Sequence, residues 1–340
     1  MKQLIFLVSF FALILQSCDS KEAETADTIY TNGKIYTVNE TQLWAEAVAI
    51  KEGKFIMGGS TAEVETMTGE STTVVDLKGA FAMPGVFDLH AHPFITPWYG
   101  DMNLQLVGAD SKEKILDMVK KYAIENPDKE WIIGGQWLLG IFPEDSPRKE
   151  WLDAIIPDRP VALLDQTGHG MWLNSKAMEL AGINKDTETS QLIVIHKDPA
   201  TGEPTGTINE QTIQMVERVI PQAQVADYSE TIYGIFDTFL SYGITSQQTA
   251  EGHRVPMDAL KQLEDNNRLK ERVFVSWDWK TTLNLAYSLD DIENQIKTRE
   301  KYASDFIYPN YVKIFADGGP FSGTSLLLQP YEKDFAGKEG

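Results

Sequence analysis

The sequence predicts an α/β protein whose main sheet is parallel and is preceded by a smaller β-rich portion. Strand-like and helix-like segments alternate after Phe81, as they do in βα units. Residues 28–80 instead form short strand-like stretches separated by turn dipeptides such as Asn32-Gly33 and Glu52-Gly53. A hydrophobic content of 42% over 340 residues indicates a chain that buries a large core.

The expected elements follow in chain order. In the N-terminal portion, strand-like stretches cover 28–30, 34–38, 47–51, 55–58 and 73–77. Later strands are predicted over 81–87, 131–135, 161–165, 244–247, 273–277 and 311–315, and helices over 112–125, 210–220, 229–241, 256–269 and 289–302. Residues 93–160 and 184–225 are longer than ordinary βα loops, so we expect insertions over the mouth of an active site.

The first eighteen residues resemble a bacterial lipoprotein signal peptide. Met1-Lys2 precedes an apolar run from Leu4 to Leu15, which is too short to span a bilayer comfortably and leads into Ser17-Cys18. Cys18 is the only cysteine, so an intramolecular disulfide is excluded and lipid attachment is the expected use. The alternative is a secretory peptide cut elsewhere, with an incidental cysteine. Residues 19–27 are polar and acidic and are predicted to be a flexible tether.

A lipid-anchored protein of this kind is expected in the cell envelope, on the extracytoplasmic side of a bacterial membrane. Several acyl chains on one residue give stable anchoring. The formal charge of −20 argues against nucleic acid as a partner and against adsorption to anionic lipid through basic patches.

Asp88-Leu89-His90-Ala91-His92 is the segment with the most chemical content. Successive side chains of a strand alternate between faces, so Asp88, His90 and His92 are predicted to share one face. The two imidazoles can then converge on one divalent ion. Zinc is the expected ion, because it accepts imidazole nitrogen and keeps an open position for water in catalytic sites. The alternative is a pair of ordinary histidines at the end of a buried strand.

Other strings accompany this segment along the chain. They are Met83-Pro84-Gly85, Gly168-His169-Gly170-Met171-Trp172-Leu173-Asn174-Ser175, Gly202-Glu203-Pro204-Thr205-Gly206, Tyr242-Gly243-Ile244-Thr245-Ser246 and Val312-Lys313-Ile314-Phe315-Ala316-Asp317-Gly318. Together and in this order they resemble the metal-dependent amidohydrolase superfamily, and within it the amidohydrolase 3 group, which includes N-substituted formamide deformylase-like proteins.

The resemblance implies a fold and a domain organisation. Residues 28–80 would be part of a β-sandwich, and residues 81–340 would be an incomplete TIM-type (β/α) barrel with insertions. The superfamily supplies further metal-binding histidines and a catalytic aspartate on later strands, and no histidine follows residue 317 here. We therefore expect that the C-terminal part of the barrel is missing and that these residues alone are inactive.

Lys313 is the next candidate ligand. It lies between apolar neighbours on a predicted strand, where a lysine is costly unless it is neutralised or paired. The resemblance implies that a carboxylated Lys313 joins His90 and His92 in holding one or two divalent metal ions. The alternatives are a salt bridge to Asp317 and a surface lysine whose stem covers apolar neighbours.

Three further residues are candidates for substrate binding. His169 follows the strand predicted over 161–165, so it is expected on a βα loop at the face where barrel active sites lie; the alternative is a histidine that caps the helix near Asn174. Glu210 and Asp317 are candidates for polar groups of the pocket, or else solvated carboxylates.

The function implied by the resemblance is hydrolysis of a C–N bond, of the amide or formamide kind, by a metal-activated water on a small-molecule substrate. Two alternatives remain open. One is a hydrolytic deaminase of the same superfamily, and the other is a catalytically inactive lipoprotein that binds a ligand.

Overall fold

The computed structural model describes residues 24–94, 103–142, 146–190, 193–221, 223–279, 289–318, 325–329 and 331. The chain divides into two compact units, residues 1–84 and residues 85–340. The signal peptide expected over 1–18, with Cys18, and most of the predicted tether lie outside the described residues. In the described part of the chain no helix is long and apolar enough to cross a membrane.

The first unit contains two small sheets. In the four-stranded sheet, β1 (Thr28–Thr31) lies between β4 (Ala47–Lys51) and β6 (Thr73–Asp76), and β5 (Lys54–Gly59) pairs with β4. The three-stranded sheet has the order β3 (Trp44–Ala45), β2 (Lys34–Tyr36) and β7 (Phe81–Ala82).

A short helix completes this unit. In α1 (Thr61–Val64) the side chain of Ser60 accepts a hydrogen bond from the backbone of Glu63, and the Glu63 carboxylate accepts one from the backbone of Ser60. Val64 packs with Ile29, Ala47 and Ala49 in the core of the unit. The predicted β-rich portion is therefore present as two sheets and one helix.

The strand predicted over 81–87 is in fact two strands in different units. β7 pairs with β2 of the first unit, whereas β8 (Val86–Ala91) begins the second. Pro84 lies between them and has no amide hydrogen for a sheet, which explains the interruption. Gly85 follows, and a side chain there would collide with Thr245 of the neighbouring strand. The boundary between the units thus lies four residues after the predicted one at residue 80.

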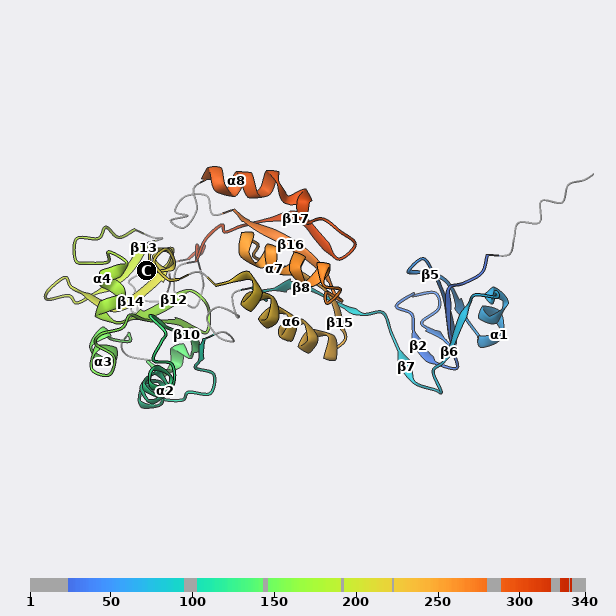
Figure 1. Ribbon diagram of the computed structural model, residues 1–340, viewed down its shortest axis with the longest axis horizontal. Helices are drawn as coiled ribbons and strands as arrows, with labels where there is room; N and C mark the ends of the chain where they lie inside the picture. Colours follow the sequence, from blue (N-terminus) through green and yellow to red (C-terminus); the bar gives the residue numbers. More distant parts are fainter. Residues whose placement is uncertain are drawn as a thin grey trace, which may run out of the picture. The chain divides into compact units, whose positions relative to one another are not determined.

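The main sheet of the second unit is parallel, as predicted (Figure 1). Its order is β8, β15 (Ile244–Thr249), β16 (Arg272–Trp279) and β17 (Ile307–Ile314), and all three strand pairs are parallel. Helices α6 (Val225–Ser241), α7 (Arg254–Asp265) and α8 (Leu289–Lys297) accompany these strands.

The two faces of this sheet differ. Val273, Val275 and Trp277 of β16 pack with residues of α6 and α7 in one buried core. On the opposite face, the ring of Phe274 stacks on Phe87 and Tyr308, with centroid distances of 4.8 and 4.5 Å. The four strands with their helices agree with the expected α/β class. Among the described residues neither β8 nor β17 pairs with another strand on its outer side, so the sheet does not close there into a barrel.

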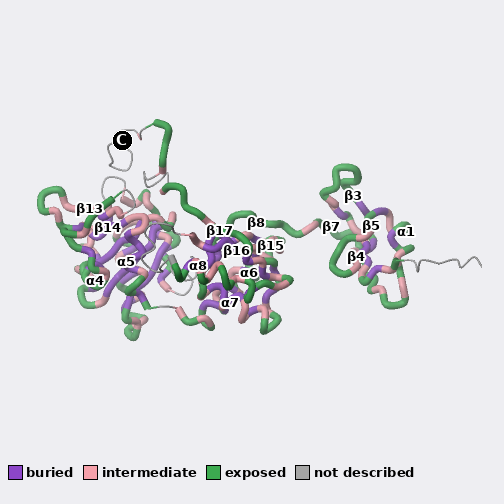
Figure 2. The backbone as a smooth tube through the Cα atoms, turned by 90° about the horizontal axis from the view of Figure 1, so that it is seen from above, coloured by how far each residue is buried: buried purple, intermediate pink, exposed green. Residues whose placement is uncertain are grey.

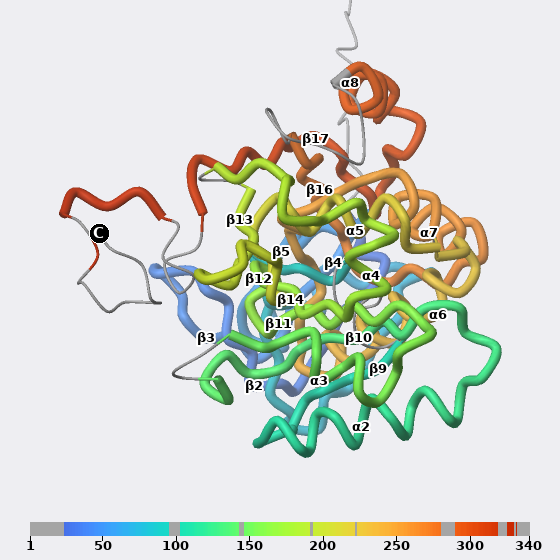
Figure 3. The backbone as a smooth tube through the Cα atoms, turned by 90° about the vertical axis from the view of Figure 1, so that its left-hand side faces the viewer, coloured from blue at the N-terminus to red at the C-terminus, as the bar shows by residue number. Residues whose placement is uncertain are grey.

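A second, six-stranded sheet lies between β8 and α6 in the chain. Its order is β13 (Ile193–Lys197), β14 (Pro204–Glu210), β12 (Gly170–Leu173), β11 (Val161–Asp165), β10 (Ile132–Trp137) and β9 (Leu104–Gln105). Four helices flank it: α2 (Lys112–Glu125), α3 (Lys149–Asp153), α4 (Ser175–Leu180) and α5 (Ile213–Glu217). Figure 3 shows α2 and α3 on one side of its strands and α5 on the other.

This sheet corrects the placement of two predicted strands. Segments 131–135 and 161–165 were expected in the parallel barrel sheet, but they form β10 and β11 of the separate sheet. All five residues of β11 are buried, because hydrophobic clusters cover both faces of the sheet. Figure 2 shows much of the backbone around β14 and α5 in purple, the colour of buried residues. A continuous apolar run is typical of any strand buried on both faces, so it does not identify the sheet to which the strand belongs.

Glu271 makes the stability of the second unit depend on pH. It precedes β16 and is 1% exposed, and in the described part of the chain its carboxylate oxygens have no hydrogen-bond partner. Burial raises the pKa of Glu271 to about 8, and the charge of Asp237 adds to the effect. The folded state therefore keeps a proton that the unfolded state loses near pH 4.5, so the free energy of unfolding falls as pH rises from about 4.5 to about 8.

We predict that Glu271→Gln removes this dependence. The neutral amide should make the protein more stable than the wild type at pH 8.5, on the order of a few kcal/mol, with a much smaller difference near pH 4.5. Urea unfolding of both proteins at the two pH values measures the difference, with the exposed Glu300→Gln as control. An equal effect of Glu271→Gln at both pH values would contradict a buried, protonated carboxyl group.

Candidate active site

His90 and His92 lie at the carboxyl end of β8, where the sequence places them. Their ring centroids are 5.2 Å apart and the ring planes are inclined by 64°. Both residues are exposed, whereas Ala91 between them is buried. The two imidazoles are therefore neighbours that solvent can reach, and their role as metal ligands stays a prediction.

The strand that carries them is less regular than predicted. Asp88 pairs with Gln247 and Ala91 pairs with Thr249, so three steps along β8 face two steps along β15. Strict alternation from Asp88 to His92 therefore does not hold. One oxygen of the Asp88 carboxylate accepts a hydrogen bond from the backbone N–H of His90 at 3.0 Å, so this side chain binds the local backbone.

Glu251 is a residue that the sequence reasoning missed. It follows the end of β15 and is 5% exposed. Its Oε2 lies 2.8 Å from Nδ1 of His92, and its Oε1 accepts a hydrogen bond from the backbone N–H of Phe94 at 3.1 Å. A signal was available, because the carboxyl ends of neighbouring parallel strands meet at one edge of a sheet. A carboxylate just after the strand predicted over 244–247 is thus expected near the histidines.

Lys313 lies on β17, opposite Asp278 of β16. Its Nζ is 4.8 Å from the centre of the Phe315 ring. The alternative of a salt bridge to Asp317 is not observed: no ion pair joins the two residues, which both lie in the described part of the chain. Asp317 is exposed, and its carboxylate accepts a hydrogen bond from the backbone N–H of Leu326 at 2.9 Å.

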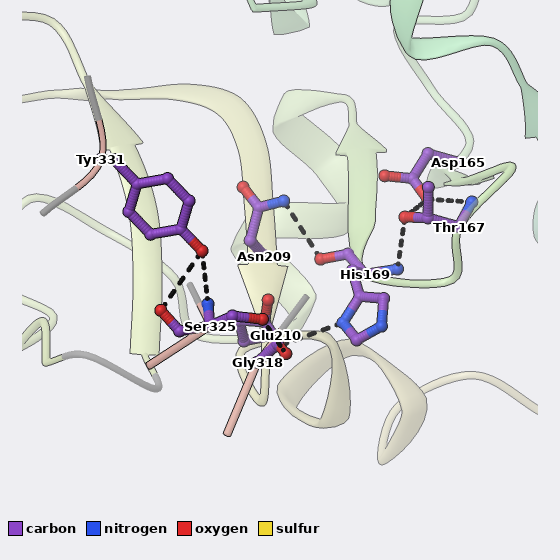
Figure 4. A network of polar contacts seen from close by, with 8 residues as sticks. All are labelled: Asp165, Thr167, His169, Asn209, Glu210, Gly318, Ser325 and Tyr331. Atoms are coloured by element: carbon purple, nitrogen blue, oxygen red, sulfur yellow. Dashed lines mark hydrogen bonds and ion pairs between the residues drawn. The ribbon is translucent and has the colours of Figure 1, made fainter. Parts of the chain in front are cut away.

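His169 and Glu210, two predicted substrate-binding residues, lie together (Figure 4). Nδ1 of His169 is 3.2 Å from Oε2 of Glu210, and their side chains are 34% and 8% exposed. The hydrogen bond with Glu210 raises the pKa of His169, an effect opposed by burial; the charges of Glu210 and Asp165 raise it further, and the charge of Lys313 lowers it.

The position of His169 differs from the prediction in one respect. It lies on the turn between the antiparallel strands β11 and β12, not on a βα loop. Asp165 shapes this turn by accepting hydrogen bonds from the backbone and side chain of Thr167 at 2.8 and 2.7 Å. His169 does not cap the next helix either, since Asn174 does so by accepting a hydrogen bond from the backbone of Ala177.

Further polar residues hold the His169 turn. The side-chain amide of Asn209 donates to the backbone carbonyl of His169 at 3.1 Å, and its oxygen lies 2.8 Å from Nε2 of His196. The hydroxyl of Ser146 lies 2.8 Å from Nδ1 of His196. The backbone position of His169 is therefore fixed by side chains of its own sheet.

Figure 4 also shows a separate contact, in which the hydroxyl of Ser325 donates to the carbonyl of Gly318 at 2.8 Å.

The donor set fits part of a metal site. Two adjacent imidazoles suit a divalent transition metal, and Nδ1 of His92 is already held by a carboxylate, as is usual for a metal-ligating histidine. Within the described ranges, no three His, Cys, Asp or Glu side chains are grouped closely enough to hold an ion. The described residues thus offer two ligands of these kinds, with Lys313 as the remaining candidate.

Comparisons with known proteins agree with this description. A family model described as the amidohydrolase family matches residues 73–339. LONG AFTER FAR-RED 3 of Arabidopsis thaliana is 26% identical over 331 residues, which cover 93% of this chain and 54% of that protein. N-substituted formamide deformylase of Arthrobacter pascens is 24% identical over 229 residues, which cover 64% and 41%.

A solved structure is also similar. The structure of a metal-dependent hydrolase from Pyrococcus horikoshii matches with a TM-score of 0.63 and 24% identity, over 92% of this chain and 59% of that one. This likeness shows a shared fold. The chain spans about half the length of the curated relatives described above.

We predict that Glu210 controls the protonation of His169. Glu210→Gln should lower the pKa of His169, because it removes the charged partner of the hydrogen bond and its negative charge. Titration of the His169 ring protons by NMR measures the shift. Glu203→Gln, which removes an exposed carboxylate before β14, is the matched control and should leave that pKa unchanged. An unchanged His169 pKa in Glu210→Gln would contradict the pairing.

Proposed function

Because this chain belongs to the amidohydrolase family, as its sequence motifs predict, we propose that it carries a metal centre for the hydrolysis of amide-type C–N bonds. The observation that carries the proposal is the neighbouring pair His90 and His92 at the carboxyl end of β8. Active sites of parallel α/β folds lie at that end of the strands.

We propose zinc as the ion, held by His90, His92 and a carboxylated Lys313. When bound, the ion would supply an acidified water and would polarise a carbonyl oxygen, the chemistry needed for hydrolysis of an amide. The exposure of both histidines leaves room for water and substrate. Lys313 lies on β17 of the same parallel sheet as β8, which is why we include it in the ligand set.

His169 and Glu210 are proposed to bind the substrate. Glu210 is nearly buried and accepts a hydrogen bond from Nδ1 of His169, so Nε2 can donate toward a carbonyl oxygen only when the ring is protonated, the form that the raised pKa of His169 favours. Hydrogen bonds to a developing oxyanion stabilise the transition state of acyl transfer. Asp317 would be a further polar group for the amine portion of the substrate.

The proposed substrates are small amides or formamides. This proposal extends to the chain what the name of the Arthrobacter pascens relative says of that protein. A hydrolytic deaminase would act on a C–N bond by the same metal-bound water, so the two reactions differ in the group that is released. A ligand-binding protein without catalysis would need no metal.

We predict that zinc binding by the chain depends on both histidines. His90→Ala and His92→Ala should each weaken zinc affinity by at least about tenfold, since even loss of an outer-shell partner costs about 10–100-fold. Competition with a chromophoric chelator measures the affinity. His196→Gln, which removes a histidine of the six-stranded sheet, is the control and should bind zinc as the wild type does.

An activity panel then separates the candidate reactions. The complete protein, loaded with zinc, should release amine from N-acyl amines or formamides, whereas ammonia release from amino-substituted heterocycles would support the deaminase. Unchanged zinc affinity in both alanine variants would contradict the metal centre. Ligand binding with neither metal nor turnover would support the binding protein.

We propose in addition that Cys18 carries the lipid that anchors the protein to a bacterial membrane. Cys18→Ser should therefore release the protein to the soluble fraction or leave it unprocessed. Membrane fractionation and mass spectrometry of the N-terminus measure the two outcomes. A processed Cys18→Ser protein that stays in the membrane fraction would contradict the anchor.

A further inference from the structure

We propose that Glu251 is a positioning residue that presents Nε2 of His92 to the metal ion, an inference that rests on the proposed function. Its carboxylate contacts two groups next to the end of β8. Oε2 lies 2.8 Å from Nδ1 of His92, and Oε1 accepts the backbone N–H of Phe94 at 3.1 Å. One buried side chain from the end of β15 thus holds both the imidazole and the chain that follows β8.

The backbone on both sides of the contact between Glu251 and His92 is held by further interactions. The backbone N–H of Ala250 donates to the carbonyl of Ala91 at 2.9 Å, which joins the segment before Glu251 to the end of β8. Phe94 is 2% exposed, and its packing with α6 and α7 in the core fixes its backbone. Its carbonyl also accepts a hydrogen bond from the hydroxyl of Tyr228, whereas Glu251 binds its backbone N–H. The carboxylate is therefore held beside the His92 ring.

The hydrogen-bond chemistry decides the tautomer of His92. An ionised carboxylate only accepts hydrogen bonds, so a contact of 2.8 Å requires a proton on Nδ1. In the neutral ring the lone pair then lies on Nε2, the nitrogen left for a metal ion. The ring of His90 has no hydrogen-bond partner among the described residues. A carboxylate therefore orients only one of the two histidines, His92.

Substitution by glutamine should reverse this arrangement. Phe94 offers a backbone N–H, which requires an oxygen in the Oε1 position. In Glu251→Gln the single carbonyl oxygen of the new side-chain amide would take that position, and its amino group would face Nδ1 of His92. The ring would then carry its proton on Nε2, where it blocks metal binding, although the shape of the side chain is unchanged.

The experiment compares the full chain with Glu251→Gln, His92→Ala and Tyr228→Phe. Zinc is the probe, and its affinity is measured by chelator competition at pH 8. Glu251→Gln should weaken binding about 10–100-fold. In the metal-free protein at the same pH, ¹⁵N NMR should show the His92 proton on Nδ1 in the wild type and on Nε2 in Glu251→Gln. Tyr228→Phe removes the other hydrogen bond to Phe94 and should leave both readouts unchanged; circular dichroism verifies the fold of each variant.

The possible failures are distinguishable. Wild-type zinc affinity in Glu251→Gln, together with weakened binding in His92→Ala, would overturn the positioning role and leave the metal centre intact. An Nε2-protonated ring in the wild type would overturn the same inference. Unchanged affinity in His92→Ala would overturn the proposed metal centre itself, and the positioning role with it.

Discussion

The parallel pairing of β8 with β15 is the constraint on which the candidate site depends. It brings the segment after Ala91 next to the segment after Thr249, so that His92 and Glu251, 159 residues apart in the sequence, are in contact. Gly85 is part of the same constraint, because the entry to β8 passes too close to Thr245 for any side chain. The register shift between Asp88 and Ala91 then sets where the two histidines emerge from the sheet.

The six-stranded sheet is formed within one long connection between β8 and α6. Its core is independent, since hydrophobic clusters cover both of its faces. It supplies His169 on one strand turn and Glu210 at the end of another strand, and side chains of the same sheet fix the backbone of that turn. A rigid insertion of this kind positions polar groups more accurately than a long loop, which would have to be ordered when the substrate binds.

Local patterns of apolar and capping residues predicted several helices and strands correctly. The helix predicted over 112–125 is observed with the same bounds, since Ser111 caps it and Ile115, Val119 and Ala123 form its buried face. The parallel strands near 244–247, 273–277 and 311–315 and the adjacency of His90 and His92 also follow from local pattern. What local pattern could not predict is which sheet 131–135 and 161–165 join, because buried strands of any sheet have the same apolar composition. Glu251 was missed because its place just after a predicted parallel strand points to the histidines only when that strand is taken as the neighbour of the strand that carries them.

The proposed function depends above all on whether His90 and His92 bind a metal ion together at the end of β8. X-ray absorption spectroscopy of the zinc-loaded full chain tests it most directly, because scattering by imidazole rings is distinct from that of isolated oxygen ligands. The account predicts at least two imidazole nitrogens at about 2.0–2.1 Å from zinc, and fewer rings in His92→Ala. A zinc environment of oxygen atoms alone, identical in the wild type and in that variant, would contradict it.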